Sequence, residues 1–221
     1  GHRPKHLHHF VIYAISLCAV LGLTFLLTFD TAIEIALTTF CVVAIIYAIS
    51  LSFKLQNKFE RNKMLALLIF YCFSAVFWAF YMQIFTSVTL FSERNVDRWV
   101  FGWHIPTAML QSIIPVFLIL FSPLAARVWL RLSQSKYNPS ISLKFAYGQL
   151  FQALSYLVLI IGMTFSHQAV VALFWLVISG LLRAIGELAL SPIGLSIVTK
   201  LSPVKYVGML RGIWFLSTAF G

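Results

Sequence analysis

Residues 169–198 read AVVALFWLVISGLLRAIGELALSPIGLSIV, and Arg183 and Glu187 are the only charged residues among them. A helix needs about 20 apolar residues to cross the hydrocarbon core of a bilayer, and a longer run crosses with some tilt. The stretch therefore predicts a membrane-spanning helix that carries two charges near its middle.

Six further segments have the same apolar character: 10–29, 32–53, 64–91, 105–132, 143–165 and 206–221. The chain is 61% hydrophobic and 10% charged, whereas a soluble domain carries about 25% charged residues. We predict an all-α membrane protein, a multi-pass helical bundle that crosses the lipid bilayer six or seven times. The last segment is short and stops while still apolar, which indicates a truncated sequence.

The basic residues gather in alternate breaks between these segments. One side of the predicted bundle receives 13 of the 16 lysines and arginines, namely Arg3, Lys5, Lys54, Lys58, Arg61, Lys63, Arg127, Arg131, Lys136, Lys144, Lys200, Lys205 and Arg211. Such an excess is typical of cytoplasmic loops, so we predict that the sequence starts in the cytoplasm and lies in the cell membrane. A nucleic-acid partner is not expected, because it requires basic residues on one contiguous face.

Arg183 and Glu187 are the candidates for chemistry. Burying a charge at the bilayer centre costs about 2.5 to 3.5 kcal/mol, so such residues usually face a partner or an aqueous cavity. Their four-residue spacing places them on one helix face, where they can pair. Two interpretations remain open, a structural ion pair and a substrate or proton site.

Motifs for metal binding or catalysis are missing from the sequence. Cys18, Cys41 and Cys72 lie inside apolar runs without C-x-x-C spacing, and the four histidines near the start have no acidic or cysteine neighbour. Neither a phosphate loop nor a nucleophile elbow occurs. We expect no metal, no bound cofactor and no enzymatic activity.

Proline and glycine mark two of the segments. Pro115 and Pro123 fall in the segment 105–132, and Pro192 lies between Gly186 and Gly194 on the segment 169–198. Because proline removes a helix hydrogen bond, we predict that both helices are interrupted, as helices beside transport sites often are.

Four strings after residue 75 resemble one family. They are VFWAFYMQIFTSVTLFSERNVDR (76–98), IPTAMLQSIIPVFLILFSPLAARVW (105–129), GELALSPIGLSIVTKLSP (186–203) and VGMLRGIWFLSTAFG (207–221). In this order they are similar to core helices seven, eight, ten and eleven of the proton-coupled oligopeptide transporter family (POT/PTR), a branch of the major facilitator superfamily. Within that family they look like the bacterial di- and tripeptide permeases.

The resemblance implies a partial major facilitator fold. Residues 1–9 become a cytoplasmic basic segment, 10–55 an extra transmembrane hairpin between two bundles, and 63–221 a truncated C-terminal bundle with core helices seven to part of eleven. Membership implies symport of di- and tripeptides with protons, by alternating access, across the bacterial inner membrane. The missing N-terminal bundle supplies the other half of the pocket.

The family's pattern also assigns residues in this sequence. Glu187 matches the glutamate that meets the amino terminus of the peptide, and Ser191 follows one turn later. Trp78 and Trp214 match pocket-lining tryptophans, and Gln83 matches the glutamine of the seventh core helix. These five residues are the expected substrate-binding set.

Three positions depart from that pattern. Met82 stands where many members have an acidic residue, and Ile114 where the eighth core helix usually has asparagine. Arg183 stands where the family has a neutral residue, and we predict that it pairs with Glu187 in proton coupling, so that a substrate competes with an internal cation. A diverged transporter of another small solute remains an alternative, because Met82 and Ile114 make the pocket less polar. A non-transporting sensor or assembly protein is a second alternative.

Overall fold

The computed structural model describes residues 12–13, 15–18, 20, 22, 24–25, 30–55, 57–166 and 170–219. It divides the chain into two compact units, Gly1–Tyr47 and Ala48–Gly221. The expected cytoplasmic segment 1–9 and half of the segment 10–29 lie outside the described residues. The hairpin expected for 10–55 therefore stays a prediction.

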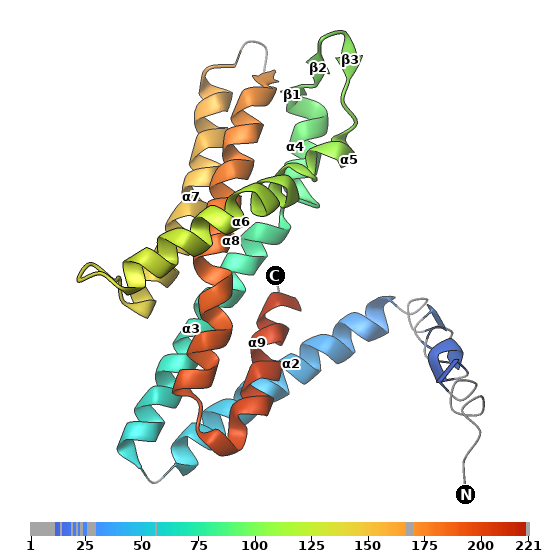
Figure 1. Cartoon of the computed structure of the whole chain (residues 1–221). Coiled ribbons are helices and arrows are strands. Elements are labelled where there is room, and N and C mark those ends of the chain that lie inside the picture. Colours follow the sequence, from blue (N-terminus) through green and yellow to red (C-terminus); the bar gives the residue numbers. More distant parts are fainter. Residues whose placement is uncertain are drawn as a thin grey trace, which may run out of the picture. The chain divides into compact units, whose positions relative to one another are not determined.

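The described residues form helices at the expected apolar segments (Figure 1). These helices are α2 (Asp30–Lys54), α3 (Lys58–Met82), α4 (Ser87–Asn95), α5 (Thr107–Leu110), α6 (Ile113–Ser133), α7 (Ile141–Thr164), α8 (Leu173–Leu201), the 3-10 helix η1 (Val204–Tyr206) and α9 (Val207–Ala219). Four described stretches are long and apolar enough to cross a membrane, Lys58–Asn95, Thr107–Ser133, Ile141–Thr164 and Leu173–Leu201. The prediction of a multi-pass helical membrane protein is confirmed over this part of the chain.

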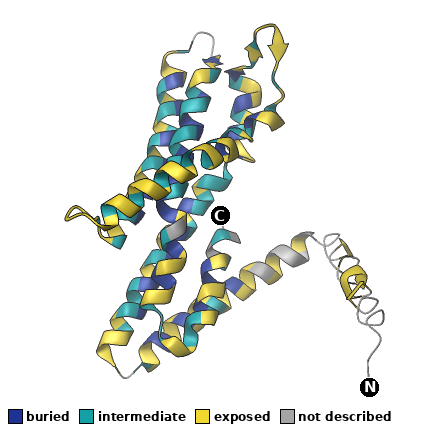
Figure 2. Ribbon diagram, in the orientation of Figure 1, coloured by how far each residue is buried: buried dark blue, intermediate teal, exposed yellow. Residues whose placement is uncertain are grey.

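α8 is the central helix of the second unit. In its most apolar stretch 44% of the residues are buried, against 6% in the stretch formed by α5 and α6. Figure 2 shows the same contrast between the two helices. α7 packs closely against α8 where Gly148 meets Gly186, because a Cβ built on Gly186 would lie 3.0 Å from the Gly148 carbonyl oxygen. Small residues let two helices approach in this way. Because Gly186 precedes Glu187, this contact holds α8 against α7 at the position of the glutamate.

The segment 64–91 does not form one continuous helix. α3 ends at Met82, four turn residues follow, and α4 begins at Ser87. At the break, the backbone N–H of Ile84 donates to the carbonyl of Tyr81 at 3.3 Å instead of reaching the carbonyl of Phe80. The Phe80 carbonyl is left without its usual helix donor, which matters for the site described below.

Pro115 and Pro123 have different effects on the segment 105–132. The segment is broken at 111–112, and Pro115 lies in the first turn of α6, where its missing N–H has no intrahelical partner to lose. Pro123 lies inside α6, which continues past it to Ser133. The predicted interruption is therefore found just before Pro115, and Pro123 makes none.

The predicted interruption of the segment 169–198 was wrong. α8 continues from Leu173 to Leu201 through Pro192. Pro192 cannot donate to the carbonyl of Leu188, but Nε1–H of Trp129 on α6 donates to that carbonyl at 3.3 Å. A donor from a neighbouring helix thus replaces the lost helix bond, which is how proline is tolerated in membrane helices.

Short strands join the helix ends near the start of α8. Their bounds are β1 (Val96–Asp97), β2 (Trp99–Val100), β3 (Trp103–His104) and β4 (Val171–Ala172). β1 pairs with β4 in parallel, so the end of α4 is fixed to the start of α8. β2 and β3 form an antiparallel hairpin, and its turn residues Phe101 and Gly102 both have positive φ, 48° and 80°. Turns of this kind match the twist of a two-residue hairpin.

The apolar core lies where the α3–α4 break, α5, α6, α7 and α8 meet. Its buried members are Ile84, Val88, Leu110, Ile114, Leu159, Leu176 and Ala184. Because Ala184 neighbours Arg183 and precedes Glu187 by one turn, this cluster supports the helix that carries both charges.

Candidate binding site

Glu187 lies half-buried on α8 and is hydrogen-bonded to α3. The hydroxyl of Tyr81 donates to its carboxylate oxygen Oε2. Its second oxygen, Oε1, receives no hydrogen bond from the described residues. It is not among the buried polar atoms that lack a partner, so it remains accessible. A carboxylate held at one oxygen and open at the other can accept a cationic group.

Aromatic rings surround Tyr81 on α3. The Trp78 ring meets the Tyr81 ring edge-on at 5.2 Å between centroids, and the Phe77 ring stacks on Tyr81 at 5.8 Å. Nε1 of Trp78 is buried and has no hydrogen-bond partner within the described part of the chain. The structure therefore brings together Trp78 and Glu187, two of the residues that the sequence assigned to the substrate, with Tyr81 between them.

Arg183 is fully buried one turn before Glu187. Its guanidinium lies over the ring of Tyr156, 4.5 Å from the centroid, and Nη1 makes a long contact of 3.5 Å to the Tyr81 carbonyl. Nε and Nη2 have no partner among the residues that the structure describes. Cation–π contact and one carbonyl therefore hold a cation that most proteins would pair with a carboxylate.

The direct ion pair predicted for Arg183 and Glu187 is not formed between these two described residues. A helical side chain leans toward the N-terminal end of its helix, so the arginine turns away from a glutamate that follows it. Arginine before glutamate is also the less favourable order for a pair four residues apart. Glu187 takes its hydrogen bond from Tyr81 instead.

The break after α3 is covered by side chains from α7 and α8. The hydroxyl of Tyr156 donates to the Phe80 carbonyl at 2.5 Å, and Arg183 approaches the Tyr81 carbonyl from the other helix. Because the last carbonyls of a helix attract donors and cations, these two groups stabilise the end of α3. The position of the Tyr81 hydroxyl therefore depends on both neighbours.

Gln83 belongs to the break rather than to the surroundings of Glu187. It caps α3, and its side-chain oxygen accepts hydrogen bonds from the hydroxyls of Thr86 at 3.0 Å and Ser87 at 2.7 Å. Met82, the residue before it, is half-buried at the last position of α3. The side-chain carbonyl of Gln83 is occupied in this arrangement.

Ser191 and Trp214 lie further along α8. Ser191 is exposed one turn after Glu187. Trp214 of α9 is 5% exposed and packs on Gly194, about two turns from Glu187, with the rings of Tyr71 and Phe145 beside it at 5.8 and 6.5 Å. Trp214 thus packs against α3, α7 and α8 in this structure, and its role in substrate binding stays a prediction.

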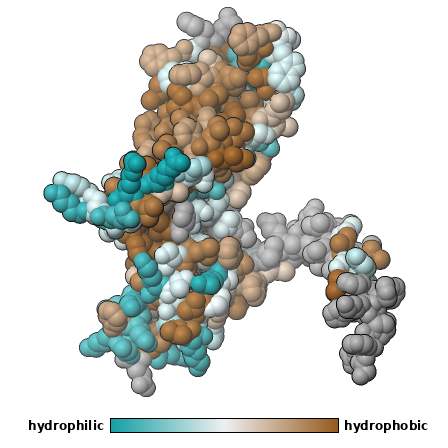
Figure 3. Space-filling view, viewed as in Figure 1, coloured by the Kyte–Doolittle hydropathy of each residue, from teal (hydrophilic) through white to brown (hydrophobic). Residues whose placement is uncertain are grey.

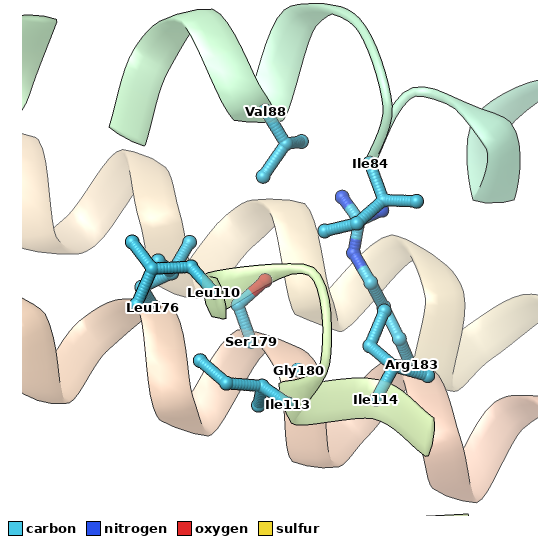
Figure 4. Close-up of a pocket in the computed structure, with 9 residues that line it drawn as sticks. All are labelled: Ile84, Val88, Leu110, Ile113, Ile114, Leu176, Ser179, Gly180 and Arg183. Atoms are coloured by element: carbon cyan, nitrogen blue, oxygen red, sulfur yellow. The ribbon is translucent and has the colours of Figure 1, made fainter. Parts of the chain in front are cut away.

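Ile114 lies in the apolar core, 2% exposed. It also lines a small cavity with a volume of about 10 Å³, room for about one water molecule. Figure 4 shows the walls of this cavity, in which Ser179 and Arg183 are the polar side chains and aliphatic groups supply the rest. The cavity is too small for a solute, so in this structure Ile114 acts as packing next to Arg183.

Tyr81 and Tyr156 are the members of the site that the sequence did not single out. Each makes its contact across a large sequence separation, 106 residues from Tyr81 to Glu187 and 76 residues from Tyr156 to Phe80. The sequence signal that could have identified Tyr81 was a polar hydroxyl inside a membrane span, one residue before Met82. The described residues contain no group of three or more metal-ligating side chains.

Comparison with known proteins points to one family for the chain. A family model described as the POT family matches residues 23–221. A crystal structure of a peptide transporter POT in complex with alafosfalin superposes with a TM-score of 0.78 at 30% identity, and covers 99% of this chain and 45% of that one. The same values of TM-score and identity hold for a structure of peptide transporter POT in complex with sulfate.

Curated relatives agree with the structural match. The peptide transporter YePEPT of Yersinia enterocolitica is 36% identical over 173 residues, which cover 77% of this chain and 34% of that protein. An uncharacterized transporter, YclF, of Bacillus subtilis is 30% identical over 197 residues, 89% of this chain and 40% of the relative. Dipeptide and tripeptide permease A of Escherichia coli is 33% identical over 160 residues, which cover 72% of this chain and 31% of that protein. The chain thus spans well under half the length of these relatives.

Proposed function

The chain belongs to the POT family, and on this premise we propose that it is part of a transporter that carries di- and tripeptides together with protons across the cell membrane. Relatives named as peptide transporters and permeases support this substrate class. Because the chain covers only part of their length, the second half of the pocket comes from residues outside it, and transport proceeds by alternating access between the two halves.

The observation that supports this function is the carboxylate of Glu187. It is the only acidic residue of α8, it is half-buried, and Oε1 is left open while Tyr81 holds Oε2. The amino terminus of a peptide is an ammonium group, and its attraction to a carboxylate is several times stronger in a low-dielectric cavity than in water. Glu187 therefore binds the peptide amino terminus and takes part in proton coupling.

Tyr81 acts as a positioning residue in this proposal. Its hydroxyl fixes the carboxylate of Glu187 so that Oε1 faces the substrate, while Trp78 and Phe77 hold the tyrosine ring. The guanidinium of Arg183 turns away from Glu187 but approaches Tyr81, the residue that holds Glu187, and from there it opposes a second cation at the site. The substrate ammonium therefore binds against the repulsion of an internal guanidinium that has no carboxylate of its own among the described residues.

The test is uptake of a labelled dipeptide by the full-length protein in proteoliposomes with an imposed proton gradient. Glu187→Gln should abolish gradient-driven uptake, whereas Glu93→Gln, an exposed acidic residue of α4, should leave it unchanged. A peptide with an acetylated amino terminus should fail to compete. Wild-type uptake by Glu187→Gln would contradict the role of the carboxylate.

A matched pair of variants tests Tyr81. Tyr81→Phe should raise KM about tenfold with a smaller change in kcat, because a hydrogen bond to a charged group contributes about 1.5 to 3 kcal/mol. Tyr137→Phe removes an exposed hydroxyl between α6 and α7 and should change neither constant. If Tyr81→Phe and the wild type have the same KM and kcat, Tyr81 does not position Glu187.

Transport of another small solute is the alternative that Met82 and Ile114 favour. Ile114 is buried in hydrocarbon surroundings, so it offers no polar group to a peptide backbone. Competition of labelled dipeptide uptake by peptides and by non-peptide solutes separates the two substrate classes. Lysine and arginine at the ends of α3, α6 and α8 support the proposal that these ends face the cytoplasm, and cysteine labelling from either side of the membrane tests it.

A further inference from the structure

A second concave surface of the protein lies away from Glu187, on the side where α6 and α7 flank α8. It is a groove with a volume of about 320 Å³. Five residues of α6 between 121 and 129 form one wall, Tyr147 and Phe151 of α7 form the other, and Ile185, Leu188 and Ala189 of α8 form the floor. Its lining is almost entirely aliphatic and aromatic, and its volume is within the range of pockets that hold a small ligand.

Positive charge gathers at one end of this groove. The ammonium of Lys144 lies over the ring of Trp129, a groove residue, at 5.1 Å from the centroid. Arg131 is exposed three residues after the groove residue Val128, hence on an adjoining strip of α6. Figure 3 shows hydrophilic atoms where α6 ends and α7 begins, beside a largely hydrophobic surface.

This positive charge has no acidic neighbour in the sequence. Residues 98–186 contain six basic residues, Arg98, Arg127, Arg131, Lys136, Lys144 and Arg183, but not one aspartate or glutamate. Arg131 lies in the last turn of α6 and Lys144 in the first turn of α7, at the adjoining ends of two stretches that are long and apolar enough to cross a membrane. Basic side chains at the ends of membrane helices reach toward the headgroups, where lipid phosphates lie.

We propose that this groove binds one anionic phospholipid, with an acyl chain between α6 and α7 and the phosphate at Lys144 and Arg131. A groove that opens to hydrocarbon suits an acyl chain, and basic pockets between membrane helices select anionic headgroups. A zwitterionic lipid matches the apolar walls equally well but leaves the two cations without a net negative partner. The lipid touches Trp129, whose indole N–H supports α8 at Leu188, one residue from Glu187.

Native mass spectrometry of the purified full-length protein tests this site, with phosphatidylglycerol and phosphatidylcholine of identical acyl chains as probes. The wild type should retain one phosphatidylglycerol in clear preference to phosphatidylcholine. Lys144→Gln and Arg131→Gln should each lower that retention about fivefold, the effect expected of one basic residue near a headgroup. Lys58→Gln removes an exposed basic residue of α3 outside the groove and should have no effect.

A second pair of variants tests the apolar part of the site. Val128→Trp fills the groove from an exposed position, whereas Leu130→Trp adds the same ring at an exposed position on the opposite face of α6. Only Val128→Trp should remove the retained lipid. Equal effects of the two tryptophans would overturn the proposal. Equal retention of both lipids by the wild type would also overturn it. That result is expected if another segment of the chain or a second copy of the protein covers the groove.

Discussion

The contact between Gly194 and Trp214 predicts that one added methyl group at position 194 destabilises the protein, and that a smaller ring at position 214 removes this effect. A Cβ built on Gly194 would lie 2.0 Å from Cζ2 of Trp214 and 2.7 Å from Cε2 and Cη2, whereas carbon atoms pack at about 3.5 to 4.0 Å. The indole of Gly194→Ala would therefore have to move by about 1.5 Å in a site where it is 5% exposed. Overpacking of this kind costs about 1 to 3 kcal/mol, and alanine returns about 1 kcal/mol of helix propensity.

The required displacement of about 1.5 Å puts Gly194→Ala at the upper end of that cost, so the expected net loss is about 2 kcal/mol, seen as a drop of a few degrees in the thermal midpoint of the full-length protein in detergent. Trp214→Phe lacks the three ring atoms that meet the new methyl group, so in that background Gly194→Ala should be neutral or stabilising. Gly208→Ala on α9, where no atom lies within 4 Å, is the matched control and should not lower the midpoint. An equal loss for Gly194→Ala in both backgrounds would refute the contact.

Three further predictions use the same thermal assay or uptake. Phe101→Asn should raise the thermal midpoint, because Phe101 is fully exposed at φ 48°, where asparagine is tolerated better; an unchanged midpoint contradicts the left-handed turn. Trp129→Phe should lower the free energy of unfolding by about 1 to 3 kcal/mol, because the Leu188 carbonyl loses its donor. Adding Pro192→Ala should restore stability, because alanine supplies a backbone N–H to the same carbonyl. A double variant as unstable as Trp129→Phe alone would contradict this hydrogen bond. Arg183→Gln should lower KM for dipeptides several-fold by removing the cation near Glu187, and an unchanged KM would mean that the guanidinium does not oppose the substrate.

The helices were predictable from the sequence because the length of an apolar run is set by the thickness of the bilayer. The segments 32–53 and 143–165 differ from α2 and α7 by only a few residues at each end. The division of 64–91 into α3 and α4 was not predictable, since residues 83–86 carry neither glycine nor proline. That break exists because Tyr156 and Arg183 accommodate the carbonyls that it frees, and both come from distant parts of the chain.

Pro192 illustrates the opposite error. A proline in the middle of an apolar segment predicts a broken helix when the sequence is considered alone. In the structure the indole of Trp129 donates to the carbonyl that Pro192 leaves unpaired, and α8 stays continuous. The pairing joins residues that are 59 positions apart, so a local pattern could not reveal it.

Glu187 was singled out by the sequence because an acidic residue in the middle of a membrane helix is expensive to bury, whatever its partner. The partner itself could not be inferred, since four-residue spacing pointed to Arg183 while the hydroxyl of Tyr81 occupies the carboxylate. This difference bears on function. In a closed pair with Arg183 both charges would be neutralised and the site would be structural, as the first of the two interpretations held.

The distribution of hydrogen bonds favours a binding role for the carboxylate over a purely structural one. Where the backbone is irregular, at the end of α3 and at Pro192 of α8, a donor from a neighbouring helix covers the freed carbonyl. Those groups are satisfied within the described residues, as a lipid environment requires. Glu187 is different, because one of its oxygens is held by Tyr81 and the other is left open. An acidic group that is positioned but not saturated, next to two freed backbone carbonyls that each receive a donor, is suited to receive a cation from outside the helix bundle.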